Sequence, residues 1–154
     1  MNEEVISHHS TYQLIPHISF EFQKPPEWPS EPPIVPSPSL YHEHSRRRVF
    51  DRILQKIKEA DLPGEEHVIS HITHKYRRNF KEHTLSGNSE AIRFFLTFLK
   101  TAGKNCLEDI SRQDIEAFVE HEQDRGLKAS TVKLRLRTVN AFLRYLKELL
   151  PAHD

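Results

Sequence analysis

Apolar residues recur at three- and four-residue spacings from residue 46 to residue 150, and this period constrains the fold more than any other feature. In residues 46–60 the apolar members occupy the i, i+3, i+4 and i+7 positions of one helix face. They are Val49, Phe50, Ile53, Leu54 and Ile57. The same period continues in four more segments, namely residues 65–80, a stretch ending at Gly103, residues 111–126 and residues 129–150. No segment after residue 45 alternates like a strand, so the sequence predicts an all-α bundle.

The segment ends carry signals at which helices start and stop. Leu62-Pro63-Gly64 separates the first helix from the second, and Gly126 follows the fourth. Ser111 predicts the N-cap of the fourth helix, with Asp114 three residues later in its acidic first turn. The start of the third helix is open, because three residues are candidate caps: Thr84, Ser86 and Ser89.

Residues 1–45 differ from the rest in composition. They hold eight of the ten prolines, seven of them between Pro25 and Pro38, and a net charge of −5. Because proline fixes φ and lacks an amide proton, this stretch predicts extended linker instead of packed structure. We therefore expect an acidic, proline-rich flexible tail over residues 1–45, an extra helix over residues 46–64 and the main domain over residues 65–150.

Composition excludes several classes of protein. No apolar run approaches the roughly 18 residues that a membrane span needs, and the first ten residues lack the basic and apolar order of a signal peptide. A single cysteine, Cys106, excludes a disulfide framework, and the four glycines form no phosphate-binding loop. We therefore expect a cytoplasmic protein that contacts no membrane and uses no cofactor.

The net charge of zero conceals an uneven distribution. Residues 46–154 have five more basic than acidic groups, and residues 126–147 contain six bases and no acid. These six bases are Lys128, Lys133, Arg135, Arg137, Arg144 and Lys147. A solvated helix face usually offsets its bases with acids four residues away, so a block without such acids indicates a surface for a polyanion.

The fifth predicted helix places an apolar stripe beside a cationic one. At about 100° per residue, one face carries Val132, Leu136, Val139, Leu143, Leu146 and Leu150. The neighbouring face carries Lys133, Arg137, Asn140, Arg144 and Lys147. Like charges one turn apart repel each other, and the phosphate backbone of double-stranded DNA would relieve that repulsion. In a major groove, Asn140 would be placed to contact adenine and Arg137 to contact guanine.

Three basic residues outside this segment are further candidates for DNA contact. Lys75 and Arg78 belong to a basic cluster on the second predicted helix, for which a solvated face is an equal alternative. Lys104 directly follows Gly103 and is placed to meet a phosphate from a helix end.

Three histidines share one face of the second predicted helix. His67, His71 and His74 stand at i, i+4 and i+7, a spacing that suits zinc or nickel. Because the sequence fixes no carboxylate or cysteine beside them, we expect no metal site. The alternative is that this face gains positive charge below about pH 6.5 and binds anions more tightly.

Three segments together resemble one known module. They are residues 110–118 (ISRQDIEAF), 126–132 (GLKASTV) and 136–146 (LRTVNAFLRYL), preceded in the third helix by Ile92, Phe95, Phe98 and Leu99. In this order they resemble the core-binding, SAM-like N-terminal domain of tyrosine recombinases, the phage integrase family, over about residues 66–150. The resemblance implies a small orthogonal four-helix bundle that forms half of a clamp around duplex DNA. It also implies a role in DNA integration and recombination, with a recombinase catalytic domain or other recombinase subunits as partners.

In that family the chemistry belongs to a second domain, which carries a catalytic arginine, a lysine, an HxxR motif and a nucleophilic tyrosine. The sequence ends where the linker to that domain is expected, so we interpret the chain as a DNA-binding module and not an enzyme. His74-Lys-Tyr-Arg77 has the HxxR pattern and Tyr145 lies downstream, but the string precedes the family segments, which favours coincidence. Two alternatives remain: a helical protein-interaction or regulatory domain, and the remnant of a truncated integrase.

Overall fold

The computed structural model describes residue 27, residue 34 and residues 37–150, and every regular element among them is helical. The elements are α1 (Pro38–Glu59), α2 (Glu65–Arg77), α3 (Glu82–Thr101), the 3-10 turn η1 (Leu107–Asp109), α4 (Arg112–Asp124) and α5 (Ala129–Leu149). The predicted all-α fold, with one helix ahead of a four-helix bundle, is confirmed. None of these helices is both long enough and apolar enough to cross a membrane. Most of the predicted tail lies outside the described residues.

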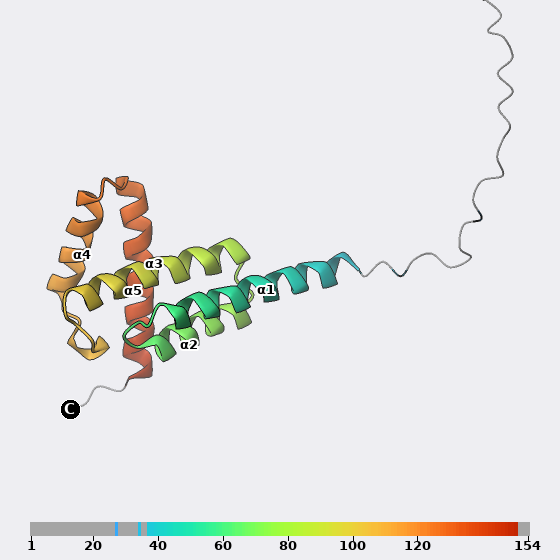
Figure 1. The fold of residues 1–154 in the computed structure, drawn as a ribbon, viewed down its shortest axis with the longest axis horizontal. Helices are drawn as coiled ribbons and strands as arrows, with labels where there is room; N and C mark the ends of the chain where they lie inside the picture. The colour runs from blue at the N-terminus through green and yellow to red at the C-terminus, as the bar shows by residue number, and fades with distance from the viewer. Residues whose placement is uncertain (1–26, 28–33, 35–36, 151–154) are drawn as a thin grey trace, which may run out of the picture. The chain divides into compact units, whose positions relative to one another are not determined.

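Helix α3 is the centre of the bundle, because it contacts each of the other four α-helices. In Figure 1, α1, α2 and α3 run alongside one another, α5 crosses α3, and α4 lies beside α5. The sequence of α3 suits this place, because its apolar residues cover more than one stripe. Its buried residues are Leu85, Ser89, Ala91, Ile92, Phe95, Leu96 and Leu99.

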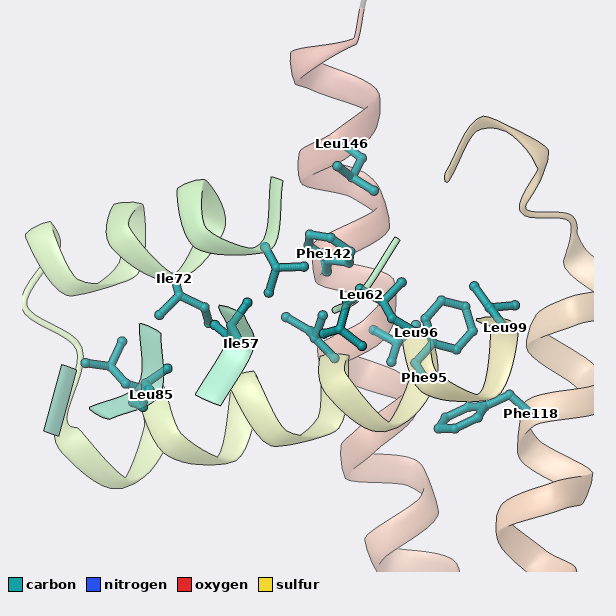
Figure 2. Close-up of a cluster of buried hydrophobic side chains, with 14 of the residues drawn as sticks. Ile57, Leu62, Ile72, Leu85, Phe95, Leu96, Leu99, Phe118, Phe142 and Leu146 are labelled. Atoms are coloured by element: carbon teal, nitrogen blue, oxygen red, sulfur yellow. The ribbon is translucent and has the colours of Figure 1, made fainter. Parts of the chain in front are cut away.

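The core is one continuous cluster that runs along α3. Figure 2 shows Phe95 and Leu96 near its middle, with Phe118 of α4 on one side and Phe142 of α5 on another. The rings of Phe95 and Phe118 meet edge to face, with centroids 5.2 Å apart. Leu85 and Ile72 extend the cluster between α2 and α3 (Figure 2).

Helix α1 begins at Pro38, eight residues before the start that the apolar period predicts. Proline is favourable at this position because the first N–H groups of a helix have no intrahelical partner, so Pro38 starts the helix where the sequence suggested linker. Residues 38–45, assigned to the tail above, are therefore helical. Leu40 and Tyr41 are 46% and 57% exposed, and the first buried residue of α1 is Phe50. The early turns of α1 thus extend beyond the core (Figure 1).

The core face of α5 is rotated relative to the predicted stripe. The buried residues of α5 are Val132, Thr138, Val139, Phe142 and Leu146, whereas Leu136, Leu143 and Leu150 are half-buried. The rotation is toward Phe142, because α2 and α3 pack on that side. The Phe142 ring lies against His71 of α2, and the Thr138 hydroxyl donates a hydrogen bond to Asn88 of α3.

Gly64, between α1 and α2, adopts a left-handed conformation with φ +68°. A Cβ atom there would lie 2.1 Å from the Leu107 Cδ1 atom, so G64A combines backbone strain with a steric clash. We expect G64A to lower the free energy of unfolding by about 2–3 kcal/mol in chemical denaturation. G103A is the matched control, because Gly103 has φ +83° and open space around its Cβ position. Its expected loss is about 1 kcal/mol, and equal losses would contradict the role of Leu107.

Candidate nucleic-acid interface

Helix α5 displays a row of polar side chains along one face, here called the α5 row: Lys133, Arg137, Asn140, Arg144 and Lys147. All five residues are exposed, as is Lys128 at the N-cap. Within residues 37–150, none of the basic members of the row forms an ion pair or a side-chain hydrogen bond. The apolar side of α5 is anchored in the core, so the row is held on a rigid element with its charges available to a ligand.

Arg135 lies apart from the row and is engaged inside the protein. Its guanidinium donates to the carboxylate of Glu122 on α4 and lies 4.3 Å from the centroid of the Phe94 ring. Glu122 is 1% exposed and also accepts from Arg125 at 2.9 Å. A buried carboxylate needs such partners, so Arg135 serves the packing of α4 against α5.

Lys104 is also paired within the protein. Its Nζ atom lies 2.6 Å from the Oδ2 atom of Asp114 and donates to the Asp109 carbonyl at 3.2 Å. Asp114 and Ser111 form the capping box of α4, which confirms the predicted start of that helix. The Lys104 ammonium and the Ser111 donors lower the pKa of Asp114 to about 2. Lys104 therefore supports this helix start.

The predicted basic cluster on α2 is only partly open. Arg78 is exposed, whereas Lys75 is half-buried with its ammonium 5.3 Å from the centroid of the Phe80 ring, and burial lowers its pKa. Arg46 also belongs to this region, but it was not predicted there because it lies on α1, outside the sequence of α2. Its guanidinium lies on the Tyr76 ring and donates to the carbonyls of Tyr76 and Phe80, which ties α1 to the end of α2.

A hollow of ≈ 360 Å³ lies between the first turns of α3 and α5. Its lining includes the side chains of Thr84, Asn88, Thr131 and Thr138, with the 62% exposed Leu134 at its edge. No local charge pattern marks these four residues as a group, because they come from two helices and are uncharged. Thr84 was predicted only as one of three candidate N-caps, and all three are wrong, because α3 begins earlier, at Glu82, with Lys81 as its N-cap.

The three histidines of α2 do not share an environment. His71 is buried against Phe142 and Tyr145, and neither ring nitrogen has a hydrogen-bond partner. Burial, with smaller contributions from Lys75 and His74, lowers the pKa of His71 to about 4. His74 is exposed. No group of three metal-ligating side chains occurs among the described residues, and a neutral His71 adds no positive charge to this face near pH 6.5.

Of the HxxR string, His74 lies near Tyr145, with ring centroids 6.0 Å apart, but no hydrogen bond joins these two side chains among the described residues. His74 and Arg77 are exposed on α2, whereas the Tyr145 hydroxyl shares a 2.7 Å hydrogen bond with Ser70. That bond joins α2 to α5 on the side where His71 also packs. Arg144 and Tyr145 are consecutive, so they point about 100° apart around α5. The α5 row therefore lies on a different side of α5 from α2.

Comparison with known proteins agrees with the fold. The family described as "Phage integrase, N-terminal SAM-like domain" matches residues 49–148, which includes the second half of α1. Tyrosine recombinase XerC of Bacillus pumilus (strain SAFR-032) is 28% identical over 69 residues, and XerC of Bacillus subtilis (strain 168) is 26% identical over 69 residues. Each alignment covers 45% of this chain and 23% of the relative, so the chain matches about a quarter of either recombinase.

No solved structure matches the chain significantly. The family match covers nearly two thirds of the sequence, and the five described helices fit a domain of this kind. The chain therefore belongs to the family of phage integrase N-terminal SAM-like domains and is related to tyrosine recombinases.

Proposed function

We propose that this chain binds double-stranded DNA as the core-binding domain of a tyrosine-type site-specific recombinase, in DNA integration or recombination. The observation that carries the proposal is the α5 row, whose four basic members are exposed and have no ion-pair partner among residues 37–150. Duplex DNA presents one negative charge per about 1.7 Å of its axis, which suits cations spaced along a helix. Family membership supports the same function.

The DNA-contacting residues that we propose are those on open surface. They are Lys128, Lys133, Arg137, Asn140, Arg144 and Lys147, with Arg78 as a candidate on α2. Arg135, Lys104 and Lys75 are left out, because Glu122, Asp114 and the Phe80 ring already engage them. Basic members of the row would contact phosphates, and Asn140 and Arg137 would be placed to read adenine and guanine edges.

We further propose that the chain holds DNA and does not cut it. Strand cleavage would belong to a recombinase catalytic domain or to another recombinase subunit, which carries the arginine, lysine, HxxR and tyrosine set. We do not assign cleavage to the chain's own HxxR string and Tyr145, because the Tyr145 hydroxyl pairs with Ser70, and neither His74 nor Arg77 hydrogen-bonds to it among the described residues.

The double substitution Arg137→Glu with Arg144→Glu tests the proposal. The assay is titration of a fluorescent duplex of about 30 base pairs at several salt concentrations. For about five phosphate contacts, the wild-type log–log slope of affinity against salt should be about −4 to −5. The double variant should bind at least about 100-fold more weakly, with a slope smaller in magnitude by about 2.

The matched control is Arg52→Glu with Lys56→Glu, which changes the net charge equally on α1. Both residues are exposed, and α1 does not contact α5. This control should bind DNA within a few-fold of the wild type. A wild-type affinity that does not change with salt, or an equal loss in the control, would overturn the proposal.

A further inference from the structure

A second surface of the bundle is a groove between α4 and the carboxyl-terminal half of α5. It has a volume of ≈ 790 Å³ and is open to solvent between η1, the first turn of α4 and the last turns of α5. Six apolar residues form its floor: Leu107, Ile110, Ile115, Leu143, Leu146 and Leu150. Leu146 is 5% exposed and belongs to the core, whereas the other five are half-buried and leave apolar surface uncovered.

The rim of this groove is mostly positive. Asn140, Arg144 and Lys147 of the α5 row line one side, and Arg112 of α4 lines the other. Glu108 is the one acidic residue in the lining. Arg112 is paired with Glu116 at 2.9 Å, whereas Arg144 and Lys147 have no ion-pair partner in the described part of the chain. The groove thus combines an apolar floor with two unpaired cations on one side.

We propose that this groove binds a short amphipathic segment of a protein partner, with adjacent apolar side chains flanked by carboxylates. The apolar floor favours a segment with apolar side chains, because an uncovered cluster of aliphatic residues is stabilised by burial. The cations on the rim favour carboxylates beside those side chains, because the charges are complementary. The volume lies within the range of pockets that hold ligands, and recognition would be of the helix-in-groove kind.

Nucleic acid is a poor occupant for the floor itself. The six floor residues are aliphatic, and none offers an aromatic ring on which a base can stack or a polar group that reads a base edge. Duplex DNA would contact only the rim. Because Asn140, Arg144 and Lys147 belong to both surfaces, the peptide and DNA would compete for this end of α5. The inference does not depend on DNA binding, since the floor lies outside the α5 row.

Fluorescence polarisation with a synthetic peptide tests the groove on the full chain. The probe is a labelled 12-residue helical peptide with leucine at positions 1, 4, 5 and 8 and glutamate at the other exposed positions, a spacing that forms one apolar stripe. We expect saturable binding in the micromolar range. Versions with serine for leucine, or with lysine for glutamate, should each bind at least about tenfold more weakly. Equal binding of either version, or no saturation below about 1 mM, would overturn the proposal.

Protein variants then locate the peptide. Leu150→Ser removes apolar surface from the floor at the end of α5 without adding a charge, and Leu134→Ser is the matched control on the same helix outside the groove. Leu150→Ser should weaken peptide binding at least tenfold and leave DNA affinity nearly unchanged, whereas Leu134→Ser should leave peptide binding unchanged. Arg137→Glu should weaken DNA binding only, because Arg137 does not line the groove.

The same variants separate this inference from the DNA proposal. If Leu150→Ser binds the peptide as the wild type does while Arg137→Glu loses it, the peptide binds the α5 row as a polyanion and the groove inference is wrong. If Leu150→Ser loses the peptide but no variant affects DNA, the groove inference stands and the DNA proposal fails. Circular dichroism of each variant confirms that a loss of binding comes from a folded protein.

Discussion

Replacing Glu122 with alanine is expected to lower the free energy of unfolding by about 3–5 kcal/mol. The Glu122 carboxylate is 1% exposed, and it accepts hydrogen bonds from the guanidinium groups of Arg125 and Arg135. Without it, Arg135 keeps a positive charge in a place where 18% of its side chain is exposed. The loss of the pair, together with the charge left unpaired, makes this one of the largest single-residue effects expected in the chain. Urea denaturation followed by circular dichroism measures it.

Glu120→Ala is the matched control, because Glu120 is an exposed carboxylate on the same helix. Its expected change is within about 0.5 kcal/mol. Replacing both members of the buried pair, as Glu122→Leu with Arg135→Met, should restore most of the lost stability, since apolar residues of similar size need no partner charge. In the double-mutant cycle formed by Glu122→Leu, Arg135→Met and the double variant, the coupling free energy should be about 1–3 kcal/mol. If Glu122→Ala matches Glu120→Ala, the pair contributes nothing to folding.

The pairing of Arg135 also shows which part of the interface could be predicted from the sequence. The α5 row is a local pattern within one helix, so its exposure follows from spacing alone, and all five members are exposed. The partner of Arg135 comes from α4, thirteen residues earlier in the chain, and no local pattern marks that contact. Lys104 is similar, because its role depends on how the loop after α3 returns Lys104 to Asp114. The sequence predicts which residues are charged, whereas tertiary packing decides which charges remain free.

The same distinction applies to the fold. Regular apolar spacing and the glycine and proline breaks predicted the helical segments, and the capping box predicted the start of α4. The start of α1 was missed, because Pro38 reads as a linker residue in a proline-rich stretch although proline is also favourable in a first helical turn. The core face of α5 was predicted from periodicity, but its rotation toward Phe142 depends on where α2 and α3 pack. The groove beside α4 had no sequence signal, because its lining comes from η1, α4 and α5.

Lowering the pH from 7 to 4.5 is expected to destabilise the bundle through His71. Burial lowers the pKa of His71 to about 4, whereas in the unfolded chain it titrates near 6.5. Below about pH 6.5 the unfolded state binds a proton that the folded state does not, so stability is greatest above this pH and falls until the pH approaches 4. The full difference is on the order of 3 kcal/mol. Urea denaturation at a series of pH values measures the slope.

His71→Leu should abolish most of this dependence, because leucine does not titrate and the two ring nitrogens of His71 have no partner to lose. His83→Gln is the control, since His83 is exposed on α3 and is not among the groups that lower the pKa of His71, so its replacement should leave the slope nearly unchanged. Asp114 contributes little to the change above pH 4.5, because its stabilising effect is lost only as the pH falls below its unfolded-state pKa of about 3.9 toward its folded-state pKa of about 2. An unchanged slope in His71→Leu would show that other groups cause the acid sensitivity. Because His71 packs against Phe142 and Tyr145, its protonation would loosen the contact between α2 and α5, the helix that carries the proposed DNA-binding row.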